Sequence, residues 1–234
     1  MADFSRALDL ALDALARRGP PGGAALLAEM RPLLLRAGPV PRRGPLTHDL
    51  IVPGEAVGAN VFEHGRGLGL REAMLDHAAR MGQRSAVEAL FARPGTTWAG
   101  GLLQRREGPR IKLYAVSPEP QRGVDITPRG EARWRSYHAP FPLEWPSVDW
   151  PPPQEAESHR LITVLGDEKR TLNVIFRPGA PLAPLLRLGA PSWLAELDAA
   201  LAPLGFTSRS VAWELDLHAD GRVETDALIA IGAE

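Results

Sequence analysis

The sequence predicts an α+β fold in which antiparallel β-hairpins alternate with amphipathic helices. Stretches in which apolar and polar residues alternate every second position come in pairs joined by turn residues, and stretches of helical spacing lie between these pairs. The order hairpin, helix, hairpin occurs twice, at residues 46–118 and 159–232. We interpret this recurrence as an internal duplication within a single domain that spans residues 1–234.

Composition narrows the classes of function. The net charge is −1, from 27 basic and 28 acidic residues, which argues against a partner held by bulk electrostatics, such as nucleic acid or a membrane surface. The chain has no cysteine, so disulfides and thiolate metal sites are excluded and a cytoplasmic location is expected. The longest apolar runs are far below the roughly 20 residues that a membrane helix needs.

Two helices are expected in residues 1–40. Phe4, Leu8, Leu12 and Leu15 share one face of the first, which ends at "RRGPPGG". The second runs from about residue 24 to 37, and Pro32 interrupts its hydrogen-bond ladder.

The first repeat, residues 46–118, begins with "LTHDLIVPGEAVGANVFEHG", two short apolar runs joined by Pro-Gly-Glu, which predicts a hairpin. Helical spacing follows in "LGLREAMLDHAARMGQRSAVEALFA". A second hairpin, "TTWAGGLLQRREGPRIKLYAVSP", completes the repeat.

Residues 119–158 connect the repeats and contain eight prolines together with Trp134, Trp145 and Trp150. Tryptophan needs a surface to pack on, so we expect an ordered, extended segment wrapped over the domain, with a functional lid as the less favoured alternative. The second repeat, residues 159–232, has its first hairpin turn at Gly166-Asp167 and its last at residues 219–221. The prediction is therefore eight strands.

The strand "EGPRIKLYAVSP" places Arg110, Lys112 and Tyr114 on one face and Ile111 and Leu113 on the other. Half-polar strands of this kind suit an open sheet with helices on one side, or a barrel with helices outside and a polar cavity inside. The pattern alone leaves both closures open. It also leaves open that the triplet is an ordinary solvent-facing strand.

At Arg110-x-Lys112-x-Tyr114 the chain resembles the ABBA aromatic prenyltransferases, which include the dimethylallyltryptophan synthase group. The resemblance extends over the hairpin and helix order of residues 46–232. It implies an antiparallel β-barrel with helices outside, in which the Arg-x-Lys-x-Tyr strand binds the diphosphate of an isoprenoid donor in the lumen. It also implies metal-independent chemistry without a cofactor. In that family the barrel typically has ten strands, against the eight predicted here.

The residue types fit this role on physical grounds. Arg110 offers a planar charged fork and Lys112 a mobile point charge, and both stabilise a departing diphosphate. Tyr114 can donate a hydrogen bond to the diphosphate or turn its ring toward an allyl cation. The strand "RVETDALIAIG", in contrast, places Glu224, Asp226 and Leu228 where further cations are expected.

Other candidates are chosen by position. Arg105, Arg177 and His64 could replace the missing cations, since they lie near predicted strand ends. Glu63, Glu214 and Asp216 could remove the aromatic proton, although a satisfied lumen or surface carboxylate is the plainer interpretation of each. Trp98 and Trp213 could shield a cation, whereas packing against helices is the plainer interpretation.

The sequence thus predicts transfer of a prenyl group from an isoprenoid diphosphate to an aromatic small molecule or peptide side chain, by a monomer without bound metal, nucleic acid or membrane. The alternative is a barrel that has lost the diphosphate site and binds a small molecule or a partner protein. A triphosphate-tunnel hydrolase ranks third, because its Glu-x-Glu-x-Lys strand is absent.

Overall fold

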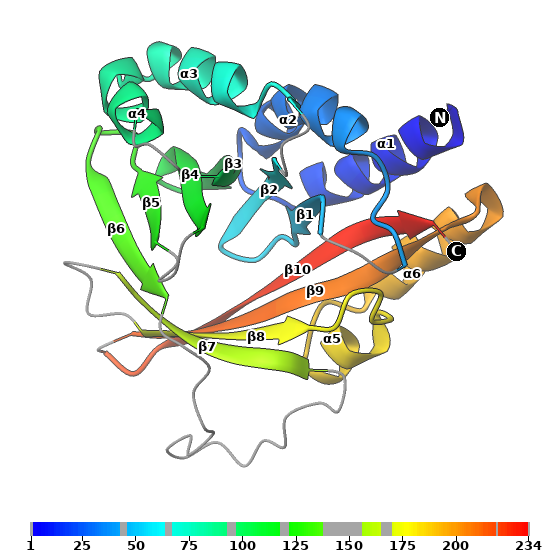
Figure 1. Cartoon of the computed structure of the whole chain (residues 1–234). Helices are drawn as coiled ribbons and strands as arrows, with labels where there is room; N and C mark the ends of the chain where they lie inside the picture. Colours follow the sequence, from blue (N-terminus) through cyan, green and yellow to red (C-terminus); the bar gives the residue numbers. More distant parts are fainter. Residues whose placement is uncertain are drawn as a thin grey trace.

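The computed structural model describes residues 2–42, 46–63, 67–92, 97–117, 122–137, 156–164, 170–218 and 220–233. It is an α+β structure in which a curled antiparallel sheet is flanked by helices (Figure 1). Two helices, α1 (Ala2–Ala16) and α2 (Gly23–Ala37), precede the first strand, as the periodicity predicts, and Pro32 lies inside α2.

The sheet and its helices follow in chain order. The elements are β1 (His48–Ile51), β2 (Ala56–Phe62), α3 (Leu70–Arg80), α4 (Arg84–Phe91), β3 (Thr97–Arg105), β4 (Gly108–Ser117), β5 (Arg122–Ile126), β6 (Ala132–Tyr137), β7 (Ala156–Val164), β8 (Arg170–Phe176), α5 (Ala183–Arg187), α6 (Trp193–Leu201), the 3₁₀ turn η1 (Ala202–Leu204), β9 (Phe206–Leu217) and β10 (Val223–Ala233).

Each strand pairs with its neighbours in the chain, and the pairing closes into a ring. β1 pairs with β2 on one side and with β10 on the other, so the strand order is a closed barrel of ten antiparallel strands. The expectation of eight strands is therefore wrong. The two additional strands, β5 and β6, lie in the connection at 119–158, where the prolines and tryptophans hid a short alternating pattern.

The order of hairpin, two helices and hairpin occurs twice along the chain. β1–β2, α3–α4 and β3–β4 form the first set, and β7–β8, α5–α6 and β9–β10 form the second. A duplication origin stays a prediction. The turn predicted at Gly166-Asp167 lies outside the described residues.

One face of the strands packs on the helices and the other faces the lumen. The main hydrophobic core joins the apolar faces of the helices to Leu50, Ile111, Leu113, Val174 and Ile229 of the strands. Residues that alternate with these lie on the inner face. A separate small cluster of Ile51, Ala56, Leu103 and Leu228 lies on that inner face.

Because the strands alternate in direction, the short hairpin turns gather at one end of the barrel and the helical connections at the other. We call these the hairpin end and the helix end. No helix in the described part of the chain is long and apolar enough to cross a membrane.

Candidate functional site in the barrel lumen

Lys112 lies at the centre of a basic wall formed by β3 and β4. Its residue is only 5 % exposed, and its cross-strand partners are Gly101 on β3 and Asp125 on β5. Directly opposed residues of antiparallel strands share a face, so Lys112 and Asp125 both belong to the inner face. Gly101 carries no side chain, and a Cβ atom there would meet the backbone of Ala59 and Asn60 on β2.

Arg105 and Arg110 continue this wall toward the hairpin end. Burial lowers the pKa of Arg110, and the charge of Arg105 lowers it further, so the two guanidiniums are close enough to repel. The Nε atoms of both arginines are buried without a hydrogen-bond partner among the described residues. Unsatisfied cationic donors of this kind favour an anionic ligand.

Tyr114 completes the predicted triplet on the inner face. It lies opposite Ala99 on β3 and Gly123 on β5, so small residues flank the ring on both sides. The ammonium group of Lys112 lies 6.0 Å from the centre of the Tyr114 ring. The structure therefore brings Arg110, Lys112 and Tyr114 together along one strand inside the barrel.

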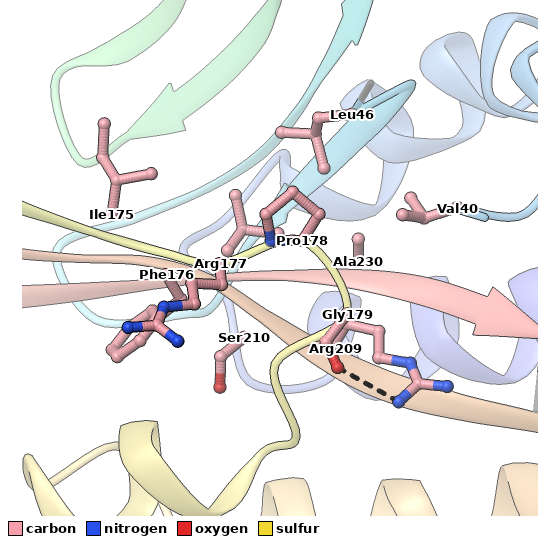
Figure 2. A pocket seen from close by; sticks show the side chains of 11 residues that line it. Val40, Leu46, Ile175, Phe176, Arg177, Pro178, Gly179, Arg209, Ser210 and Ala230 are labelled. Carbon is pink, nitrogen blue, oxygen red and sulfur yellow. Dashed lines mark hydrogen bonds between the residues drawn. The ribbon is translucent and has the colours of Figure 1, made fainter. Parts of the chain in front are cut away.

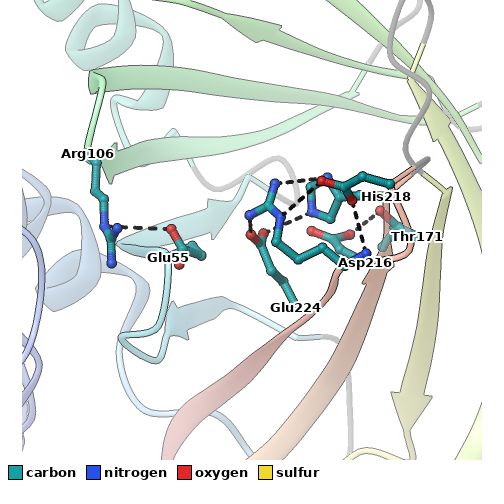
Figure 3. Close-up of polar contacts among 8 residues, drawn as sticks. Glu55, Arg106, Thr171, Asp216, His218 and Glu224 are labelled. Atoms are coloured by element: carbon teal, nitrogen blue, oxygen red, sulfur yellow. Dashed lines mark hydrogen bonds and ion pairs between the residues drawn. The ribbon is translucent and has the colours of Figure 1, made fainter.

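An acidic wall on β9 and β10 faces the same lumen. Glu214 lies opposite Asp226, and Asp216 lies opposite Glu224. The Asn173 amide on β8 donates to Glu214 Oε1 at 2.8 Å. Figure 3 shows the second contact, in which the Thr171 hydroxyl donates to Asp216 Oδ1. Glu214 and Asp216 are thus placed in the lumen as the sequence suggests, each with a polar partner from β8.

Asp49 and Asn60 are inner-face residues that the sequence analysis missed. They are cross-strand partners on β1 and β2, and Asn60 Nδ2 donates to Asp49 Oδ1 at 2.7 Å. Burial raises the pKa of Asp49 to about 7, against the opposing effects of Asn60 and Lys112. A signal was available, because each is a polar residue next to or within a short apolar run, "DLIV" for Asp49 and "GANVF" for Asn60.

Asp226 links the acidic wall to the basic one. Burial raises the pKa of Asp226 to about 6, the charge of Glu214 raises it further, and Arg105 and Lys112 oppose the rise. Glu214 also raises the pKa of Asp49. The lumen therefore holds carboxylates at intermediate proton affinity a short distance from the cations, an arrangement suited to proton transfer near neutral pH.

The hairpin end is fastened by ion pairs. Glu224 pairs with His218 at 3.2 Å and also with Arg222 (Figure 3). These two ion pairs hold the β9–β10 turn closed. Arg106 pairs with Glu55 at 3.8 Å and so connects the β3–β4 and β1–β2 turns.

Several predicted residues lie elsewhere. Trp98 and Trp213 belong to the hydrophobic core against the helices, and Trp98 packs edge-on against Phe91 of α4. Their side chains are therefore on the outer face of the barrel, which corrects the expectation that they shield a cation in the lumen. The bulk of an indole is better accommodated between sheet and helices than in a narrow lumen.

The other displaced candidates lie at strand ends. Arg177 is exposed just beyond β8 at the helix end, opposite to Arg105 at the hairpin end, so the two cations cannot share one diphosphate. Glu63 follows the last residue of β2, and its backbone N–H donates to the Trp98 carbonyl at 3.4 Å. The structure does not bring it to Glu214 and Asp216 on the β9 wall. His64 lies outside the described residues.

In the described ranges, no group of three or more His, Asp or Glu side chains is placed to hold a metal ion. Comparison of the chain with family models, with curated proteins and with solved structures gives no match.

Proposed function

We propose that the protein transfers a prenyl group from an allylic diphosphate to an aromatic acceptor. The observation that carries this proposal is the row formed by Arg110, Lys112 and Tyr114 on the inner face of a closed antiparallel barrel. Ten strands with paired helices between hairpins also agree with an ABBA-type barrel better than eight strands would. The diphosphate is expected to bind Lys112, Arg110 and the neighbouring Arg105.

The reaction would divide between the two walls. The allylic C–O bond breaks, and the diphosphate leaves with the electron pair, stabilised by the three cations. An aromatic ring carbon of the acceptor attacks the allyl cation and forms a C–C bond. The proton on that carbon passes to a lumen carboxylate, for which Asp49 and Glu214 are placed, and aromaticity returns.

A second function is favoured by the charge of the inner face. On β9 and β10 the inner face carries the carboxylates Glu214, Asp216, Glu224 and Asp226. Carboxylates repel a diphosphate of about three negative charges. A barrel that binds a small molecule without catalysis is therefore the alternative proposal.

Titration with an allylic diphosphate separates the two. We expect dimethylallyl or geranyl diphosphate, without magnesium, to raise the melting temperature, because a ligand at about 100 times its Kd adds roughly 2.7 kcal/mol of stability. Lys112→Met and Arg105→Met should each weaken binding at least tenfold, since each removes a cation from the lumen.

The matched control is Arg106→Met. This arginine is adjacent to Arg105, but its side chain is 75 % exposed and pairs with Glu55 outside the lumen. Binding to Arg106→Met should equal binding to the unaltered protein. Absence of any stabilisation at millimolar diphosphate would remove the transferase proposal and favour the non-catalytic barrel.

A further inference from the structure

The Asp49–Asn60 pair has an unused hydrogen-bond acceptor. Both residues are almost fully buried, at 4 % and 2 % exposure. Asn60 Nδ2 donates to Asp49, whereas Asn60 Oδ1 is buried without a hydrogen-bond partner in the described part of the chain. Leaving such an oxygen unsatisfied is costly, and a ligand that brings an N–H or O–H donor would remove the cost.

The charge around this pair selects among donors. Glu214 on β9 acts on Asp49 on β1 and on Asp226 on β10, and raises the pKa of both carboxyl groups. The charge of Lys112 lowers the pKa of both Asp49 and Asp226, and the charge of Arg105 lowers the pKa of Asp226. Asp216 also raises the pKa of Asp226. Four carboxylates therefore share two cations, and a positively charged donor gains more here than a neutral one.

An apolar cavity begins at the β10 neighbour of Asp49, although Asp49 and Asn60 are not among the residues that line it. Ala230 follows Ile229, the partner of Leu50, and therefore lies next to Asp49 on the inner face. It helps to line a cavity of about 240 Å³ near the helix end, together with Val40, Leu46, Ile175 and Val211 (Figure 2). This volume corresponds to roughly eight water molecules at ~30 Å³ each, so the occupant must be small.

The two arginines that line the cavity, Arg177 and Arg209, do not bind the Asp49–Asn60 pair. Arg209 donates to the carbonyl oxygens of Gly179 at 3.3 Å and Ala233 at 3.1 Å, and Figure 2 shows its guanidinium directed at Gly179. Arg177 is exposed. The wall beside Asp49 is made of Ala230, and apolar side chains continue from it.

We propose that the lumen binds a small organic amine. Its ammonium group donates to Asp49 and to Asn60 Oδ1, within the negative field of Glu214 and Asp226, and its apolar body occupies the cavity lined by Ile175, Val211 and Ala230. An ammonium group has only donors, which matches a subsite that offers acceptors. The assignment of this amine as the prenyl acceptor depends on the proposed function, whereas the binding site does not.

Calorimetric titration with 2-phenylethylamine and its neutral counterpart 2-phenylethanol tests the proposal at pH 8, where an alkyl ammonium of pKa about 10 is charged. We expect the amine to bind at least tenfold more tightly than the alcohol. Glu214→Gln should remove most of this preference, because it deletes a charge while its side-chain carbonyl still accepts from Asn173. Asn60→Leu should weaken the amine tenfold as well.

Glu196→Gln is the control, since this carboxylate is exposed on α6. It should leave both affinities unchanged. Equal affinity for amine and alcohol, no binding of either, or an unaltered preference in folded Glu214→Gln would each overturn the proposal. None of these titrations contains a diphosphate. Amine binding without diphosphate binding would therefore contradict prenyl transfer alone, and the reverse result would contradict the amine site alone.

Discussion

Gly101→Ala is expected to destabilise the protein by about 3 kcal/mol, the upper part of the usual range for overpacking a core. A Cβ atom at this position would lie 1.8 Å from the carbonyl oxygen of Ala59 and 2.7 Å from the Cα atom of Asn60. Both contacts are with backbone, which cannot rotate away. Strands β2 and β3 would have to separate at the centre of their pairing, where Gly101 lies opposite Asn60.

Denaturant unfolding measures this effect, and thermal unfolding should show a melting temperature lower by about 6–12 °C for a chain of this size. Gly54→Ala is the matched control. Its Cβ would lie 3.5 Å from Asp226 Oδ1 and from the Thr225 carbonyl, which is ordinary contact. We expect a change within about 0.5 kcal/mol. If the two variants were equally stable, the close approach of β2 to β3 would be wrong.

The same glycine shows why the basic wall was only partly predictable. Alternation along β4 was enough to place Arg110, Lys112 and Tyr114 on one face, because the period of a strand is local. That this face is the inner one follows from ring closure, which depends on pairing between strands far apart in the chain, such as β1 with β10. The close approach of β2 to β3 at Gly101 likewise depends on strand pairing, which no local pattern reveals.

Strand length decided which of the lumen carboxylates could be predicted from the sequence. Glu214 and Asp216 were chosen as carboxylates on an alternating strand, and the register places them on the inner face. Asp49 was passed over because its strand has only four residues, too few for alternation to be visible. For the tryptophans the sequence leaves two interpretations open, since a strand pattern separates two faces without showing which of them meets the helices.

Asp49→Asn is expected to raise stability at pH 8 and to flatten its pH dependence. Burial gives Asp49 a pKa of about 7 in the folded protein, against 3.8 as the ordinary value. Between these values the folded protein holds a proton that the unfolded chain has released, so stability falls as pH rises through this window. Between pH 5 and pH 8 the unaltered protein should lose about 2–3 kcal/mol more than the variant.

The effect of Asp49 must be measured as the difference in stability between the variant and the unaltered protein, because His48 changes stability with pH in the opposite direction. Burial lowers the pKa of His48 to about 4, so the unfolded chain takes up a proton below 6.5 that the folded protein refuses, and stability falls as pH falls. The difference between Asp49→Asn and the unaltered protein cancels this contribution. Denaturant unfolding from pH 5 to 8.5 supplies the measurement.

Asp76→Asn, the same chemical change at an exposed position of α3, should follow the unaltered protein at every pH. Parallel curves for Asp49→Asn and the unaltered protein would mean that Asp49 is ionised in the folded state without penalty. Asp49 would then be able to accept a proton throughout this pH range, whereas a raised pKa restricts that role to the upper part of the range. The stability profile thus decides at which pH Asp49 can act as the base of the proposed reaction.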